Sequence, residues 1–170
     1  MARSMYSPAS RKNVDTATDP YMPRKGAPAV GLCSKCHVIR RNKRWYADEA
    51  EYRALKKKGS EAVLETCPAC RKIADGFASG VLVLRGDYLT RHRDEILNIV
   101  RNEEKRTRGI NPLERIIRLL EEGDSIEIST THEKLVQRIG REVRKACGGT
   151  LEYRRSQDVK LLRVNWERNA

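Results

Sequence analysis

The stretches Cys33-Ser34-Lys35-Cys36 and Cys67-Pro68-Ala69-Cys70 decide how the N-terminal part of this chain folds. Each has two cysteines in the Cys-x-x-Cys spacing, and thirty residues separate the two pairs. Four thiolates delivered as two close pairs form the tetrahedral ligand set that structural zinc prefers. A site closed by four sulfurs leaves no coordination position for water or substrate. We therefore expect one structural Zn²⁺ ion, held by Cys33, Cys36, Cys67 and Cys70.

Haem attachment is the main alternative for the first pair, because His37 follows Cys36 and completes a Cys-x-x-Cys-His motif. Covalent haem would leave Cys67 and Cys70 without a role. The first residues of the chain also lack the apolar core of a secretory signal, and no apolar run approaches the roughly 18 residues of a membrane span. We therefore expect a cytoplasmic protein, in which paired cysteines bind metal more often than they form disulfides. A redox dithiol, and His37 in place of one thiolate, stay open.

The composition favours a polyanionic partner. The 170 residues carry a formal net charge of +12, and the surplus is distributed over the whole chain. Nucleic acid is the partner that such a charge favours, and improved solubility alone is the alternative explanation.

Local composition divides the chain into three predicted parts. Residues 1–30 are rich in Ser, Ala, Pro and basic residues without an apolar period, which predicts a disordered basic arm. Residues 31–80 form the zinc module. A hairpin is expected over 38–46 and a helix over 47–58 that ends at Gly59. Pro68 suits the first turn of a further helix, so a treble clef is the expected geometry and a zinc ribbon the alternative.

Residues 81–170 are expected to form a compact α+β domain. The apolar patterns predict a strand near 81–89, helices over 90–108 and 112–122, a strand over 125–129, a helix over 133–147 and a hairpin over 150–166. This β-α-α-β-α-β-β order predicts a largely antiparallel sheet with helices on one face. The fifth cysteine, Cys147, is expected to be a small core residue.

Two groups of cations are the candidate RNA contacts. The first lies beside Trp45 and Tyr46 inside the zinc module and consists of Arg40, Arg41, Lys43 and Arg44. Arginine contacts phosphates or stacks on bases, as exposed aromatic rings also do. Trp45 has an alternative role as cover for the zinc site.

The second group follows the helix over 133–147. Four of its members recur at intervals of four, three and four residues and share one face, opposite an apolar row that begins at Leu135, and Arg144 lies close to that stripe. The members of the group are Lys134, Arg138, Arg141, Arg144 and Lys145. A helix with one buried and one cationic face can contact phosphates along a groove, and an ordinary solvated surface is the alternative.

No catalytic constellation is evident. His92 and His132 have no nucleophile at recognisable spacing, and the adjacent acidic pairs do not face each other on a helix. We therefore expect no enzyme activity and no small-molecule substrate.

One segment and the cysteine pattern together carry a family resemblance. The Cys-x-x-Cys…Cys-Pro-x-Cys pattern, the elements predicted after it and residues 126–140 (IEISTTHEKLVQRIG) resemble the N-terminal part of the nonsense-mediated decay protein three family. Those proteins bind the large ribosomal subunit, and in eukaryotes they act as its nuclear export adaptor. The family has four Cys-x-x-Cys pairs, whereas this chain has two. The resemblance implies association with the ribosome or ribosomal RNA, and metal binding by the four paired cysteines.

The sequence therefore predicts a non-catalytic, zinc-stabilised RNA-binding protein that acts on a ribosomal subunit or on ribosomal RNA, in assembly, quality control or silencing. Two alternatives stay open. A DNA-binding transcriptional regulator would place the same basic helix in the major groove. An interaction adaptor would use its zinc module to bind protein.

Overall fold

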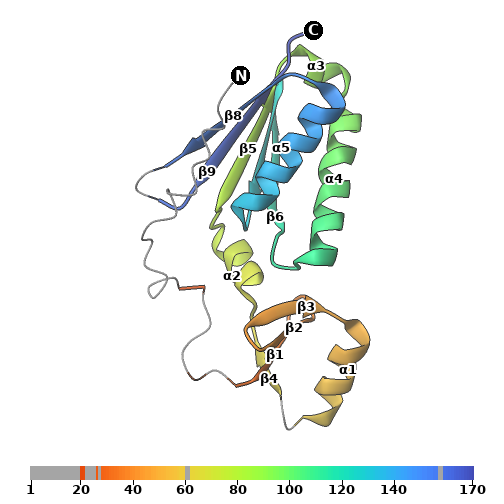
Figure 1. The fold of residues 1–170 in the computed structure, drawn as a ribbon, viewed down its shortest axis with the longest axis vertical. Coiled ribbons are helices and arrows are strands. Elements are labelled where there is room, and N and C mark those ends of the chain that lie inside the picture. Colours follow the sequence, from red (N-terminus) through yellow and green to blue (C-terminus); the bar gives the residue numbers. More distant parts are fainter. Residues whose placement is uncertain (1–19, 22–25, 27, 60–61, 157–158) are drawn as a thin grey trace.

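The computed structural model describes residues 20–21, 26, 28–59, 62–156 and 159–170. The molecule is elongated, with a small sheet and a larger sheet at opposite ends of its long axis (Figure 1). The predicted α+β class and the predominance of antiparallel pairing are confirmed. The predicted disordered arm over residues 1–30 falls largely outside the described residues. Within that range, Pro20 and Tyr21 are held by Arg71, which donates to both of their carbonyl oxygens.

The small sheet has four strands in the order β3-β2-β1-β4. Its strands are β1 (Val30–Cys33), β2 (Val38–Arg41), β3 (Arg44–Ala47) and β4 (Ala62–Glu65). Two helices accompany it, α1 (Glu49–Lys58) and α2 (Pro68–Asp75). Helix α1 begins after Asp48, whose side chain accepts from the Glu51 N–H, and ends at Gly59 with φ 65°. It packs Tyr52 onto Leu32 and Ile39, which gives this sheet its own apolar cluster.

Strand β4 was not predicted, and it pairs in parallel with β1. Its register places Cys33 opposite Glu65, two residues before Cys67. Parallel neighbours run in the same direction, so the ends of β1 and β4 lie together. Both cysteine pairs therefore follow strand ends that lie at the same end of the small sheet.

The β2–β3 hairpin turns at Asn42 and Lys43, which both have positive φ angles of 48° and 66°. Two central residues in this region define a type I′ turn, which favours Asn followed by Gly. Lysine in the left-handed region is disfavoured by about 1–2 kcal/mol. The hairpin thus carries local strain at Lys43.

Lys43→Gly is expected to stabilise the protein by about 0.5–1 kcal/mol, because relief of this strain exceeds the extra chain entropy of glycine. Urea unfolding of the metal-loaded protein would measure the change. Arg44→Gly is the matched control: it removes a cation from the extended strand β3 and should destabilise the hairpin. Equal effects of the two substitutions would contradict the prediction.

The larger sheet has five strands in the order β6-β7-β5-β9-β8, and only β5 and β9 pair in parallel. Its strands are β5 (Gly80–Arg85), β6 (Ile116–Glu122), β7 (Ser125–Thr130), β8 (Thr150–Arg155) and β9 (Leu162–Glu167). Its helices are α3 (Asp87–Arg91), α4 (Arg93–Ile110) and α5 (Glu133–Cys147). Helices α4 and α5 cover one face of the sheet (Figure 1), where Leu82, Ile128 and Val164 meet Leu135 and Ile139 in the core.

One predicted element of this domain is wrong. The helix expected over 112–122 is strand β6, so the order is β-α-α-β-β-α-β-β, and the first two helices are α3 and α4. The spacing of Leu113, Ile116 and Leu120 fits a helix, but this stretch pairs with β7 and has a bulge between Ile116 and Arg118. Pairing with a neighbouring strand overrides local periodicity here.

None of the described helices is long and apolar enough to cross a membrane.

Candidate metal centre and cationic surfaces

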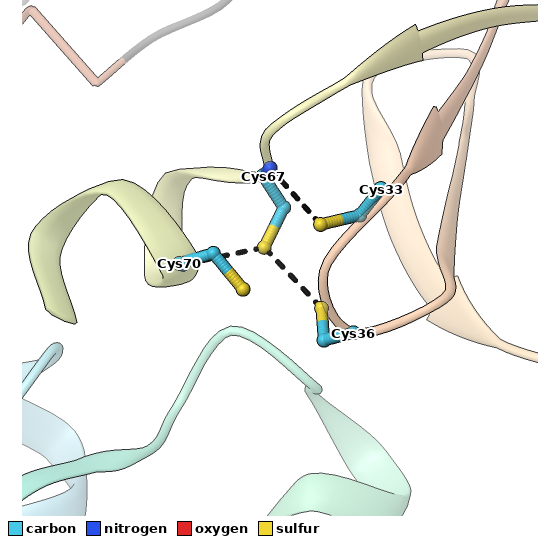
Figure 2. Close-up of side chains that lie close together, drawn as sticks. All are labelled: Cys33, Cys36, Cys67 and Cys70. Carbon is cyan, nitrogen blue, oxygen red and sulfur yellow. Dashed lines mark hydrogen bonds between the residues drawn. The ribbon is translucent and has the colours of Figure 1, made fainter. Parts of the chain in front are cut away.

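The four paired cysteines converge at one point between the small sheet and α2 (Figure 2). Cys33 ends β1, and Cys36 follows it after a tight turn. Cys67 is the N-cap of α2 and Cys70 lies in its first turn, with Pro68 at the first helical position. The second pair therefore enters at the start of a helix, as in the predicted treble clef, and not from a ribbon hairpin.

The distances between the sulfurs suit a tetrahedral metal ion. All four Sγ atoms lie within 4.8 Å of one another, and the Cys36 and Cys67 sulfurs are 3.6 Å apart. A tetrahedral ion with metal–sulfur bonds of about 2.3 Å separates its sulfur ligands by about 3.8 Å. The four thiols can thus hold one metal ion with only small adjustments.

Hydrogen bonds and burial shift the pKa values of the clustered thiols in opposite directions. The Cys67 N–H lies 3.4 Å from the Cys33 sulfur, and the Cys70 N–H lies 3.4 Å from the Cys67 sulfur. Hydrogen bonding with the Cys67 thiol lowers the pKa of Cys36 to about 5. Burial, followed by the nearby Cys36 sulfur, raises the pKa of Cys70 to about 11. A metal ion that binds all four sulfurs must therefore displace protons, and its affinity should rise with pH.

The metal centre also touches the larger domain. Arg115, in the segment between α4 and β6, donates from Nη1 to the Cys70 sulfur at 3.3 Å. Leu113 from the same segment and Trp45 from β3 pack against the cysteine cluster. Trp45 thus has the covering role that was the alternative to RNA contact. A further contact between the two parts comes from Lys72 of α2, which donates to the Thr131 carbonyl at 3.1 Å.

His37 is not one of the clustered ligands. Its ring stacks on Tyr52 with centroids 4.3 Å apart, and its Nδ1 lies 3.2 Å from a Glu49 carboxylate oxygen. The candidate metal centre therefore consists of four sulfurs within the described part of the chain.

Arg40 does not belong to an exposed cationic surface, which corrects the prediction for this residue. It is 4% exposed, and its Nε lies 2.7 Å from Glu65 Oε1. It also donates to the Pro28 carbonyl at 2.9 Å. The absence of a side chain at Gly31 makes room for this pair, because a Cβ there would lie 2.9 Å from the Arg40 guanidinium. Arg40 is therefore a structural residue of the small sheet.

The rest of the first cationic group is exposed. Arg41 forms an ion pair with Glu51 at 2.7 Å, so it is partly neutralised. Lys43 and Arg44 form no ion pair with any described carboxylate. Two of the four predicted contacts of this group thus remain available to a partner.

Four of the five cations predicted on the C-terminal helix are exposed on α5, opposite its buried row. Arg138 differs, because it lies 3.5 Å from the buried Glu114 carboxylate and 3.4 Å from the Thr107 hydroxyl. It therefore belongs to the packing of α5 against its neighbours. We define the α5 cationic surface as Lys134, Arg141, Arg144 and Lys145. No carboxylate in the described ranges forms an ion pair with these four residues.

Sequence reasoning missed a further group of cations on the open sheet face, the side of the larger sheet opposite α4 and α5. Cross-strand register aligns Arg118, Arg163 and Arg154 in one row with Val81, and all three are exposed. Arg163 alternates with the core residues Leu162 and Val164, and this alternation was a usable signal. Arg118 could not be placed while its segment was predicted as a helix.

The two histidines weighed as catalytic candidates have local partners. His92 stacks on Tyr88 with centroids 3.9 Å apart and lies 3.2 Å from Glu95. His132 is the N-cap of α5, and its Nδ1 accepts from the Lys134 N–H at 3.2 Å. Burial lowers the pKa of His132, which favours the neutral ring that this cap requires.

In comparisons with protein-family models, curated proteins and solved structures, none matches this chain.

Proposed function

We propose that this protein is a non-catalytic RNA-binding protein, stabilised by one zinc ion, that associates with ribosomal RNA or a ribosomal subunit. The observation that carries the proposal is the α5 cationic surface: four exposed cations on one helix, without a carboxylate partner in the described residues. Unpaired cations on a rigid element favour a phosphate-rich partner. The net charge of +12 supports the same conclusion.

Zinc is the metal we propose because the four thiolates are close enough to form a tetrahedral site, and thiolates bind zinc better than they bind oxygen-preferring cations. The ion would join the end of β1 to the start of α2, with all its positions filled by Cys33, Cys36, Cys67 and Cys70. Its role would then be structural. The proposal of no catalysis rests on this closed ligand set.

The α5 cationic surface has a length that suits a nucleic-acid backbone. Lys134 and Lys145 are eleven residues apart on α5, so they are separated by about 16 Å along its axis. Arg141 and Arg144 lie between them. The surface can therefore contact several successive phosphates at once, which makes binding steeply dependent on salt.

RNA is favoured over duplex DNA because the residues at the start of α5 already have partners within the protein. A recognition helix reads bases in the major groove with side chains near its N-terminus. Here His132 caps the helix, and Glu133 forms an ion pair with Arg155 at 2.8 Å. Ribosomal RNA is proposed as the target because of the sequence resemblance described above.

Co-sedimentation with ribosomal subunits, and filter binding to ribosomal RNA over a salt series, would test the proposal. Four phosphate contacts predict a log–log salt slope of about −3 to −4. Arg141→Glu combined with Lys145→Glu should weaken binding and reduce the slope by about 2. Arg101→Glu combined with Lys105→Glu makes the same charge change on α4 and should have a smaller effect. Absence of binding at low salt would refute the proposal, and tighter binding to duplex DNA would favour a DNA-binding regulator.

A further inference from the structure

An exposed tyrosine lies beside the α5 cationic surface. Tyr153 is in β8, an edge strand of the larger sheet, and is 46% exposed. Its neighbours on the same side of β8 both reach α5. Arg155 pairs with Glu133, and Leu151 lies where a Cβ on Gly140 would meet it at 3.0 Å. Tyr153 therefore stands on the side of β8 that faces α5, at a margin open to solvent.

The ring of Tyr153 has no stacking partner among the described residues, whereas most other described aromatic rings are buried or engaged. Trp166 is fully buried, and Trp45 packs on the cysteine cluster. Tyr88 lies under the Arg168 guanidinium, 3.7 Å from its ring centroid, and Phe77 lies 5.3 Å from Tyr21. An exposed ring without a stacking partner is available to a ligand.

Two cations of the α5 cationic surface lie on the part of the helix that this side of β8 approaches: Arg141 directly follows Gly140, and Arg144 lies one helical turn beyond it. Partial burial raises the pKa of the Tyr153 hydroxyl, and the positive charges of Arg141 and Arg144 oppose this rise. Both arginines are exposed, and neither forms an ion pair with a described carboxylate. An aromatic face with two unpaired guanidinium groups beside it combines the two features that bind a nucleotide: a stacking platform and phosphate donors.

We propose that Tyr153, Arg141 and Arg144 form a binding site for an unpaired nucleotide of RNA. The base stacks on the Tyr153 ring, and the two guanidinium groups contact the phosphates next to it. The site rests on the proposed RNA-binding function and specifies its substrate class, a single-stranded segment. A base held within a double helix is already stacked on both faces and cannot reach this ring.

Fluorescence anisotropy would test the site, with labelled single-stranded RNA of about twelve nucleotides and an RNA duplex of the same length. Tyr153→Leu keeps an apolar side chain on β8 but removes the aromatic face. It should weaken binding of the single strand about 5- to 100-fold and leave duplex binding nearly unchanged. Tyr153→Phe keeps the ring and should bind like the wild type. Phe77→Leu is the matched control, because it removes another exposed aromatic side chain, one that already contacts Tyr21 and Lys72.

The outcomes separate this site from the general function. If the wild type binds neither RNA at low salt, both the function and the site are wrong. If it binds single-stranded RNA and Tyr153→Leu binds equally well, the function stands and the site is wrong. Equal weakening of single-stranded and duplex binding would also overturn the site, because it indicates a loss of structure or of general surface contact.

A second variant keeps the test decisive if Tyr153→Leu does not fold. Tyr153→Trp places an indole on the same platform, and stacking of a base should quench its fluorescence when single-stranded RNA is added. The quench should be weakened by the further change Arg144→Ala, which removes one phosphate donor. Unchanged indole fluorescence at saturating RNA would overturn the proposal.

Discussion

Removal of the metal is expected to unfold the small sheet together with α1 and α2, while the five-stranded sheet stays folded. The buried residues of this part form two small clusters, three residues around Tyr52 and five around the cysteines, and three of the latter five are Cys33, Cys67 and Cys70. So small a core cannot replace the contribution of a structural metal, which is about 10–16 kcal/mol in small zinc-dependent folds. The larger core consists of residues from β5 to β9 and the helices on them, and none of its buried members is a metal ligand.

Hydrogen exchange with and without a strong chelator would measure this difference. Amides of β1 to β4 should lose protection, and those of β5, β7 and β9 should keep it. Cys67→Ser should reproduce the effect of the chelator. Cys147→Ala, which changes an α5 residue in the core of the larger domain, should leave metal binding intact. Loss of protection throughout the chain would contradict the expectation. Local loosening around Leu113 and Arg115 would agree with it, because both contact the cluster.

The second large effect is expected at the Arg40–Glu65 pair, and it should be asymmetric. Glu65→Leu leaves the Arg40 side chain, which is 5% exposed, without its carboxylate, and arginine cannot release its proton. Loss of one partner of a buried pair costs about 3–5 kcal/mol. Arg40→Leu leaves a carboxylate that is 29% exposed and can be hydrated, so the cost should be nearer 1–2 kcal/mol. The double variant should recover part of the loss caused by Glu65→Leu.

Urea unfolding of the cobalt-substituted protein would measure these costs, because the thiolate-to-cobalt absorption reports the small sheet alone. Far-UV circular dichroism would follow the larger domain in the same samples and should change little. The explanation by burial is wrong if Arg40→Leu destabilises the small sheet as much as Glu65→Leu does.

The candidate metal centre could be predicted from the sequence because its four cysteines occur in two closely spaced pairs. Spacing alone placed Cys33 and Cys36, and Pro68 marked the helix that presents Cys67 and Cys70. The hairpin and α1 were also predictable, since their turn and caps are local signals. These features depend on residues near to one another in the chain.

Features that depend on distant pairing were not predictable. Strand β6 has an apolar spacing that also fits a helix, and only its pairing with β7 decides the matter. Arg40 resembled its exposed neighbours until the parallel strand β4 placed Glu65 beside it. Arg138 likewise fitted the cationic row of α5, but Glu114 comes from the loop after α4. A charge pattern on one element cannot reveal a partner on another.

The parallel pairing of β1 and β4 brings the two ends of the segment between the cysteine pairs together, and this affects how many residues that segment can gain. The thirty residues between the cysteine pairs leave the metal centre at Cys36 and return to it at Cys67. A metal ion bound by the four cysteines would therefore close a loop in the chain, as a disulfide does in a secreted domain, and would restrict the unfolded chain for the same reason. Because the entropy of such a loop changes only slowly with its length, residues can be added between α1 and β4 with little loss of metal affinity.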